Sequence, residues 1–328
     1  MSVVYITEQG AYVKRSGQRI IVVKGKTVLK EIPVHRIERI LLFGNIQVTT
    51  QALNILMTNG IDVMLLSRAG RFKGSLVSAD SKNIYLRIAQ HKLWHDKSFR
   101  LNLAKNLVFG KIRNQLAMLR RFRKNHPEED FGKQMAILEQ MSDSVGKAGE
   151  VSVLMGIEGM SSAAYFECFA RMNRSDLDFG GRQKHPARDH VNAMLNLGYV
   201  MITNEVCSIL MSMSFDVFLG FLHGIRYGRR SLALDLVEQF RQPLVDSLIL
   251  KLINRGVFCR RDFETHDDGR VELNDDAFKR FLVCWSREME HAAGTRKKSW
   301  RDIIIEKCEE LEGVFMDRET YRPFEMRS

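Results

Sequence analysis

The 328-residue sequence predicts an α+β protein, in which a mostly antiparallel N-terminal β domain precedes a larger all-α domain that carries the candidate active site. Short β-rich runs broken by glycine fill residues 3–79, whereas apolar residues recur every three or four positions from residue 80 almost to the end. Only five prolines interrupt the chain. We therefore expect a β domain at 1–79, a linker that begins the first long helix at 80–88, and a helical domain at 89–328.

Six β-rich runs make up the predicted β domain. They are VVYIT, QGAYVKRSGQ, RIIVVKGKTVLKEIP, RIERILLFG, DVMLLS and RFKGSLV, and they are separated or bounded by Gly10, Gly17, Gly25, Gly44, Gly60 and Gly70. One segment between them differs. TTQALNILMTNG, from Thr49 to Gly60, has a threonine cap, helical apolar spacing and a terminal glycine, so it predicts a short helix.

Positive charge is concentrated at the start of the helical part. The whole chain carries a net charge of +11, and residues 82–124 hold twelve Lys or Arg and a single acid, Asp96, so this stretch accounts for the entire excess. A run of charges is usually a solvated helix face. The near absence of acids and the interleaved aromatic residues favour a surface that binds nucleic-acid phosphates, with Arg120, Arg121, Arg123 and Lys124 as candidates.

The sequence does not support a membrane protein or a protein stabilised by disulfide bonds. It lacks an apolar run long enough to be read as a membrane span, and its first residues, MSVVYITEQG, lack the layout of a signal peptide, so we expect a cytoplasmic protein. The five cysteines form no CxxC pair. They indicate buried thiols in a reducing compartment and not a disulfide frame or a structural zinc site.

Glu158 is the first residue that could carry chemistry. It lies between Gly156 and Gly159 in VLMGIEGMSSAAYFECFARM, which we interpret as the opening of a helix. A carboxylate near a helix N-terminus also has a structural explanation, because it complements the helix dipole.

His223 is the second candidate, at the end of the apolar run FDVFLGFLHGIRYGRR. A histidine in such a place is more often a core residue or a helix cap than a ligand. Its downstream neighbours favour a ligand.

Asp235 and Glu238 follow in SLALDLVEQFRQPLVDSLIL, where Ser231 is a candidate N-cap. Their spacing of three places both carboxylates on one face of an otherwise apolar helix, which is costly unless a cation lies near them. That cation is either a divalent metal or one of the neighbouring arginines, Arg226, Arg229 and Arg230.

Two carboxylates and an imidazole form a ligand set that suits Mg²⁺ or Mn²⁺, and the imidazole favours Mn²⁺. Such an ion polarises a phosphodiester and activates a water or a hydroxyl to attack it, while nearby arginines hold phosphates. The sequence contains no GxxxxGK[ST], GxSxG or HExxH motif, and its early glycines lack a dinucleotide-binding context.

These motifs resemble one family, the CRISPR-associated spacer-acquisition integrases, whose members are the first Cas protein of the adaptation machinery. GIEGMSSAAYF resembles the segment with the family's catalytic Glu, and FLHGIRYGRRSLALDLVEQFR resembles the segment with its His and second carboxylate. The resemblance places the catalytic and metal-binding roles on Glu158, His223 and Glu238, with Asp235 as an auxiliary acid. DHVNAMLNLGYVMI, with Asn192, Leu195, Gly198 and Tyr199, and YRPFEMR near the end are also similar to family segments.

The resemblance implies a β domain followed by a helical domain, and a homodimer that joins a second small CRISPR-associated protein. It implies a metal-dependent DNA endonuclease and integrase that inserts short duplex fragments into a repeat array by transesterification. One departure is HPARDHVN, from His185, where the family often carries a proline-rich run before the asparagine.

Two other functions stay open. One is a stand-alone metal nuclease that acts on branched or mobile-element DNA. The other is a non-catalytic nucleic-acid-binding scaffold in which Glu158, His223 and Glu238 are structural.

Overall fold

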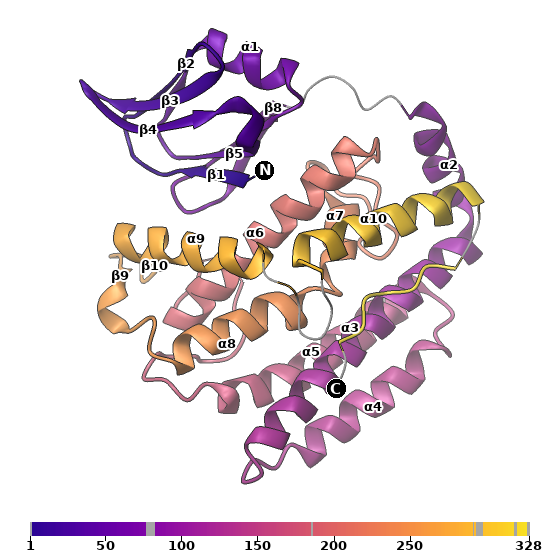
Figure 1. Cartoon of the computed structure of the whole chain (residues 1–328). Coiled ribbons are helices and arrows are strands. Elements are labelled where there is room, and N and C mark those ends of the chain that lie inside the picture. Colours follow the sequence, from indigo (N-terminus) through magenta and orange to yellow (C-terminus); the bar gives the residue numbers. More distant parts are fainter. Residues whose placement is uncertain are drawn as a thin grey trace. The chain divides into compact units, whose positions relative to one another are not determined.

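The computed structural model describes residues 2–76, 83–184, 186–290, 292, 298–317 and 320–326 (Figure 1). The chain divides into two compact units, Met1–Ser81 with Lys279–Ser286, and Lys82–Phe278 with Arg287–Ser328. The domain boundary expected at residue 79 falls outside the described residues, as does the departure from the family pattern at His185. The inclusion of a short C-terminal segment in the first unit has no counterpart in the sequence pattern.

The first unit contains two four-stranded sheets, with strand orders β1-β5-β7-β8 and β4-β3-β2-β6. Its strands are β1 (Ser2–Ile6), β2 (Tyr12–Ser16), β3 (Arg19–Lys24), β4 (Thr27–Pro33), β5 (Ile37–Phe43), β6 (Gln47–Val48), β7 (Asp62–Leu66) and β8 (Phe72–Leu76). All six predicted β-rich runs form strands, and only the two-residue β6 was not expected. The six glycines named above all have positive φ, as turns between strands require.

Both sheets and helix α1 (Thr50–Thr58) share one apolar core. Alternate residues of β1, β3 and β5 enter it, such as Val4 and Ile6 of β1. The predicted cap of α1 is confirmed, because the Thr49 side chain accepts a hydrogen bond from the Ala52 backbone N–H at 3.3 Å.

The expectation of a mostly antiparallel domain is wrong for half of the strand pairs in this unit. β1–β5, β5–β7 and β2–β6 are parallel, whereas β2–β3, β3–β4 and β7–β8 are antiparallel. Two strands pair in parallel when a crossover, and not a tight turn, connects them. The chain between β5 and β7 contains α1, a crossover that returns the next strand in the same direction.

The second unit is built mainly from helices. They are α2 (Ile84–His95), α3 (Lys97–Asn125), α4 (Gly132–Val145), α5 (Val151–Met172), α6 (His190–Ser212), α7 (Ser231–Val237), the π-helical segment η2 (Arg241–Asp246), α8 (Ser247–Asn254) and α10 (Trp300–Asp317), together with the two ends of α9 (Asp275–Glu290), whose middle belongs to the first unit. A small antiparallel ribbon of β9 (Phe263–Thr265) and β10 (Val271–Leu273) corrects the expectation of an all-α domain.

Helices α3, α4 and α5 pack side by side, and α6 lies inside the unit (Figure 1). By length and composition α6 could cross a membrane, but 83% of its apolar window is buried inside the protein, as in the core helix of a soluble protein. Cys168, Cys207 and Cys308 are buried as expected, whereas Cys259 and Cys284 are partly exposed.

A π-helical segment interrupts the helix that follows His223, and Pro243 lies in it. Proline has no N–H, so it cannot donate to the carbonyl of Gln239, four residues earlier. Asn114 of α3 supplies the missing donor, with its Nδ2 2.8 Å from Gln239 O. α6 approaches this segment closely at Gly198, where a Cβ atom would lie 2.6 Å from Val245 Cγ1.

Candidate active site

Glu158 lies in the middle of α5, two turns from its start at Val151, so the expectation that it opens a helix is wrong. Gly156 and Gly159 do not break the helix, because neighbours at helical spacing such as Leu154 and Ile157 are buried. Their packing outweighs a helix cost of about 1 kcal/mol per glycine. The helix dipole therefore does not explain the Glu158 carboxylate, and the structure pairs it with side chains instead.

Among the described residues, the side chains of Ser162 and Lys111 contact the Glu158 carboxylate. Ser162 Oγ donates to Oε1 at 2.9 Å from one turn further along α5. The Lys111 ammonium forms an ion pair with the same oxygen and comes from the middle of α3. Lys111 is only 3% exposed, so its charge requires an anionic partner.

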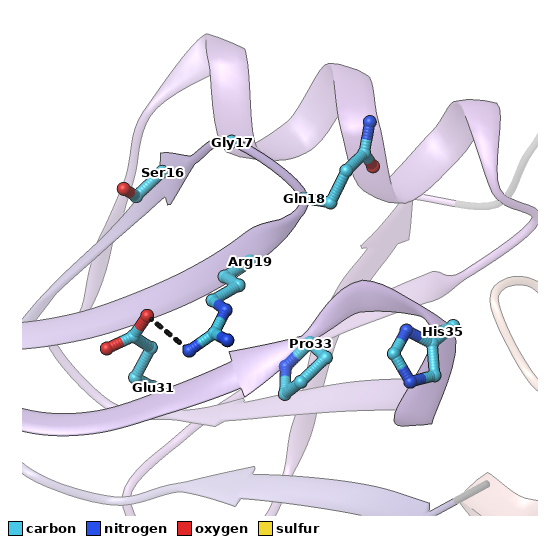
Figure 2. A pocket seen from close by; sticks show the side chains of 7 residues that line it. All are labelled: Ser16, Gly17, Gln18, Arg19, Glu31, Pro33 and His35. Carbon is cyan, nitrogen blue, oxygen red and sulfur yellow. Dashed lines mark hydrogen bonds and ion pairs between the residues drawn. The ribbon is translucent and has the colours of Figure 1, made fainter.

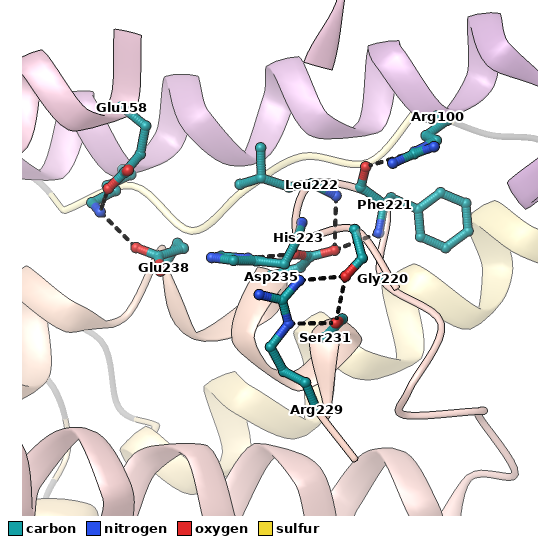
Figure 3. Close-up of polar contacts among 12 residues, drawn as sticks. Arg100, Glu158, Gly220, Phe221, Leu222, His223, Arg229, Ser231, Asp235 and Glu238 are labelled. Carbon is teal, nitrogen blue, oxygen red and sulfur yellow. Dashed lines mark hydrogen bonds and ion pairs between the residues drawn. The ribbon is translucent and has the colours of Figure 1, made fainter. Parts of the chain in front are cut away.

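Glu238 pairs with the same ammonium, and Figure 3 shows its carboxylate opposite that of Glu158. It follows the last residue of α7, is 3% exposed, and has Oε2 2.7 Å from Lys111 Nζ. Arg241, one helical turn further on, contacts Oε1 at 3.0 Å. Burial alone would raise the pKa of Glu238, but the positive charges of Arg241 and Lys111, with a smaller electrostatic contribution from His223, lower it to about 2.

His223 is oriented by Asp235. The Asp235 carboxylate is fully buried and accepts hydrogen bonds from the backbone N–H groups of Phe221, Leu222 and His223 at 2.6, 3.0 and 2.8 Å. His223 Nδ1 lies 2.8 Å from Asp235 Oδ1.

An ionised carboxylate only accepts hydrogen bonds, so we assign the proton of His223 to Nδ1, which leaves the Nε2 lone pair available as a ligand or base. The ring points from Asp235 toward Glu238 (Figure 3). Gly220 makes this loop possible, because a Cβ there would lie 2.6 Å from His223 O.

Cations do lie near Glu238, but they are not the arginines named from the sequence, and Asp235 is stabilised differently. Backbone N–H groups satisfy Asp235, while Lys111 and Arg241 neutralise Glu238. The arginines proposed from the sequence lie elsewhere. Arg229 donates to Gly224 O and to Ser231 Oγ at 3.1 Å, Arg226 is exposed, and Arg230 is partly exposed.

The expected N-cap role of Ser231 is also wrong. Arg230 occupies the cap position, and Ser231 is the first residue of α7.

The predicted ligand set converges, with a cationic side chain inside it. In the described part of the chain, no three His, Cys, Asp or Glu side chains are close enough to hold a metal ion as placed. The Lys111 ammonium lies between Glu158 and Glu238, in the position of a cation bound by both.

The donor set fits a hard divalent ion: two carboxylates and an imidazole nitrogen. Glu238 Oε2 supports this fit, because within the described ranges it is buried and has no hydrogen-bond donor in acceptable geometry.

A second layer of buried residues holds Arg241. Its guanidinium lies 4.7 Å from the centre of the Tyr199 ring, and Tyr199 OH donates to Asp246 Oδ1 at 2.5 Å. Tyr165 OH donates to Asp246 Oδ2 at 3.0 Å. Burial raises the pKa of Asp246 to about 6, against the effect of these hydrogen bonds and of the charges of Arg182 and Arg241.

Sequence reasoning missed Lys111 and Arg241 as site residues. Lys111 was counted within the basic stretch, yet it falls three and four residues from buried Leu107, Val108 and Asn114. A lysine on the buried face of a helix was the available signal, since lysine is almost never fully buried unless paired. Arg241 offered a weaker signal, its spacing of three from Glu238.

The basic stretch does not form one surface. Arg87 and Arg100 donate to the backbone carbonyls of Ser214 and Phe221, at 3.0 and 3.1 Å. Arg120 forms an ion pair with Glu139 at 2.8 Å. The exposed positive charges at the C-terminal end of α3 are Arg121, Arg123 and Lys124.

A shallow pocket of about 450 Å³ in the first unit does not coincide with any predicted site residue (Figure 2). Ser16, Gly17, Gln18, Arg19, Glu31, Pro33 and His35 line it. Arg19 and Glu31 pair across it at 2.9 Å.

Comparison with known proteins identifies similar chains. The sequence model of the family described as CRISPR associated protein Cas1 matches residues 4–287. The CRISPR-associated endonuclease Cas1 3 of Thermus thermophilus is 33% identical over all of this chain and 98% of its own length.

Two solved structures have the same fold. One, a Cas6-RT-Cas1–Cas2 complex, covers all of this chain and 36% of its own, with a TM-score of 0.86 and 22% identity. The other, a casposase bound to integration product, covers 98% of this chain and 93% of its own, with a TM-score of 0.86 and 23% identity.

Proposed function

Because this chain belongs to the Cas1 family of CRISPR-associated proteins, we propose that it cuts and joins DNA in CRISPR adaptation, inserting short DNA fragments into a repeat array. The observation that carries this proposal is the convergence of Glu158, His223 and Glu238, from three separate segments, around one buried cluster of charges. The similar Thermus protein is named an endonuclease, which supports the same chemistry.

A divalent ion, Mg²⁺ or Mn²⁺, held by Glu158, Glu238 and His223, would polarise a DNA phosphodiester and stabilise its developing charge. The protein's own contribution is to prepare the ligands. Asp235 orients the imidazole so that Nε2 faces the site, and Arg241 keeps Glu238 ionised.

In the integration step, the 3′-hydroxyl oxygen of the incoming fragment forms a bond to a phosphorus of the repeat. The existing P–O3′ bond breaks, and the proton lost by the attacking hydroxyl is balanced by one gained on the departing 3′-oxygen. One phosphodiester replaces another, so no further energy source is needed. With water as the nucleophile, the same site cuts DNA.

We expect the working assembly to be a homodimer joined to a second small CRISPR-associated protein, on DNA and in the prokaryotic cytoplasm. The similar chain in the Cas6-RT-Cas1–Cas2 complex is assembled with Cas2, which supports such a partner. The proposed DNA contacts are the exposed charges Arg121, Arg123 and Lys124, joined by Arg226, Arg229 and Arg230.

A direct test combines the protein and its small partner with Mn²⁺, a short duplex with 3′-hydroxyls and a supercoiled plasmid carrying the repeat. We expect Glu158→Ala and His223→Ala to abolish joining, and Glu167→Ala, an exposed acid on the same helix as Glu158, to retain it. Full joining by both site variants would rule out the proposed site.

The likeness to a casposase favours a second candidate, a nuclease or integrase that acts on mobile-element DNA. A plasmid without the repeat separates the two functions. Joining that depends on the repeat supports CRISPR adaptation, whereas equal joining to both plasmids supports the alternative. A non-catalytic scaffold would instead show no metal-dependent joining and no stabilisation by Mn²⁺.

A further inference from the structure

We propose that the Lys111 ammonium is the resident cation of the metal-free site, and that a divalent ion binds by displacing it from between Glu158 and Glu238. This inference rests on the proposed function, because it concerns the same three ligands. It begins from the position of Lys111, whose side chain is 4% exposed in the middle of α3 and whose Nζ contacts both carboxylates.

A cation is needed there even without metal. The side chain of Glu238 is 4% exposed and that of Glu158 is 22% exposed, so water screens their mutual repulsion poorly. Arg241 neutralises only one oxygen of Glu238, Oε1. Lys111 supplies the remaining positive charge.

The contacts of Lys111 are also suited to replacement. Its Nζ lies 2.7 Å from Glu238 Oε2 in poor hydrogen-bond geometry, so the attraction between opposite charges is the main part of this contact. The two carboxylates are the acidic partners of Lys111 in the described ranges. An ion that binds both therefore competes with Lys111 for its own partners.

Arg241 behaves differently, because it is anchored. It stacks over Tyr199, which is itself held by Asp246. Glu238 thus pairs with two cations that have separate roles. Arg241 keeps its contact and holds Glu238 in the ionised form, whereas Lys111 is displaced by the metal ion. Competition of this kind lowers the apparent metal affinity of the wild-type protein and limits the instability of the site without metal.

Lys111→Met tests the inference, because methionine keeps an unbranched chain of similar length without the charge. In EDTA we expect its Tm to lie about 5 °C below that of the wild type, since two carboxylates lose their counter-charge. On titration with Mn²⁺ we expect a larger rise in Tm and an apparent Kd about tenfold lower than in the wild type.

Lys105→Met is the matched control on the same helix. Lys105 donates to Gly146 O at 2.9 Å, away from the carboxylates, so both readouts should match the wild type. An apparent Kd for Mn²⁺ in Lys111→Met equal to or higher than that of the wild type would overturn the inference.

Glu158→Gln separates this inference from the proposed function. A wild-type Tm that does not respond to Mn²⁺ would overturn both. A response that Glu158→Gln abolishes and Lys111→Met leaves unchanged would overturn only the role of Lys111.

The wild-type protein provides a second measurement if Lys111→Met does not fold. In a crystal soaked in Mn²⁺, we expect anomalous density between Glu158 and Glu238 and Lys111 Nζ moved away from Glu238. Retention of the 2.7 Å contact beside a bound ion would contradict the inference.

Discussion

At the scale of single residues, each acid of the site is stabilised by a different means. Three backbone N–H groups hold Asp235, a lysine and a serine hold Glu158, and a lysine and an arginine hold Glu238. Asp235 is thus a positioning group for His223, whereas Glu158 and Glu238 keep oxygen atoms facing a cation. The lowered pKa of Glu238 keeps one of these acids ionised at neutral pH, which suits the metal site proposed above.

Glu238→Gln tests the charge of Glu238 through pH. The pKa of Glu238 is lowered from 4.5 to about 2 in the folded protein, so its ionised form stabilises the fold fully above pH 4.5. That stabilisation is lost as the pH falls from 4.5 toward 2. At neutral pH we expect the free energy of unfolding of Glu238→Gln to be about 3 kcal/mol lower than that of the wild type, because Lys111 and Arg241 lose a partner.

Thermal unfolding in metal-free buffer measures this difference. The gap in Tm between Glu238→Gln and the wild type should be constant from about pH 7 to pH 5 and narrow below that range. Glu167→Gln, at an exposed position of α5, serves as the control and should show little gap at any pH. A difference in Tm that widens as the pH falls would contradict the lowered pKa of Glu238.

At the scale of elements, the π-helical segment η2 connects the site to the rest of the unit. Glu238 precedes this segment, and Arg241 and Asp246 are its first and last residues. The carbonyl of Gln239, just before this segment, cannot accept from Pro243 and instead accepts from Asn114 of α3, the helix that also carries Lys111. Local irregularity in one helix thus fixes the distance between two helices that supply site residues.

Asn114→Leu tests this connection. Asn114 is fully buried, and its side chain donates to Gln239 O and Phe324 O and accepts from the Met326 N–H, at 2.8, 2.8 and 2.7 Å. Its loss leaves several buried backbone groups unpaired, at about 1–3 kcal/mol each. We expect a decrease of about 3 kcal/mol or more in the free energy of unfolding measured with urea.

Asn102→Leu, on the exposed side of the same helix, is the comparison for Asn114→Leu and should change stability by about 0.5 kcal/mol or less. Equal effects of the two substitutions would show that the Asn114 contacts do not stabilise this connection.

At the scale of the whole molecule, the net charge of +11 is divided between structural and exposed positions. Lys111, Arg87 and Arg100 have partners inside the protein, and Arg120 pairs with Glu139. The exposed group at the end of α3 is therefore a smaller surface than the charge count alone predicts.

The triple substitution Arg121→Ala, Arg123→Ala and Lys124→Ala tests that surface. Each lost phosphate contact should reduce the slope of log K against log salt by about 0.9. Fluorescence anisotropy with a duplex between about 50 and 200 mM salt measures the slope. The control is the double variant Lys133→Ala with Lys147→Ala, two exposed lysines in α4 and just after it. An unaltered salt slope in the triple variant would show that these three charges form only a solvated helix face.

The local chemistry of the chain was accessible from its sequence. Alternation, glycine positions and helical spacing predicted the strands, the turns and the long helices, because these patterns depend on neighbours a few residues apart. The resemblance to the integrase family, now shown as membership, identified Glu158, His223 and Glu238 as candidates, and those assignments stay a prediction.

Only the tertiary structure decided how distant residues meet. Strand direction in the first unit, the position of Glu158 inside a helix and the insertion of Lys111 between two acids all depend on contacts between distant segments. Lys111 is separated from Glu158 by 47 residues and is contributed by another helix. Sequence spacing specifies which face of a helix a residue occupies, but the partner of a buried charge is set by the packing of whole helices.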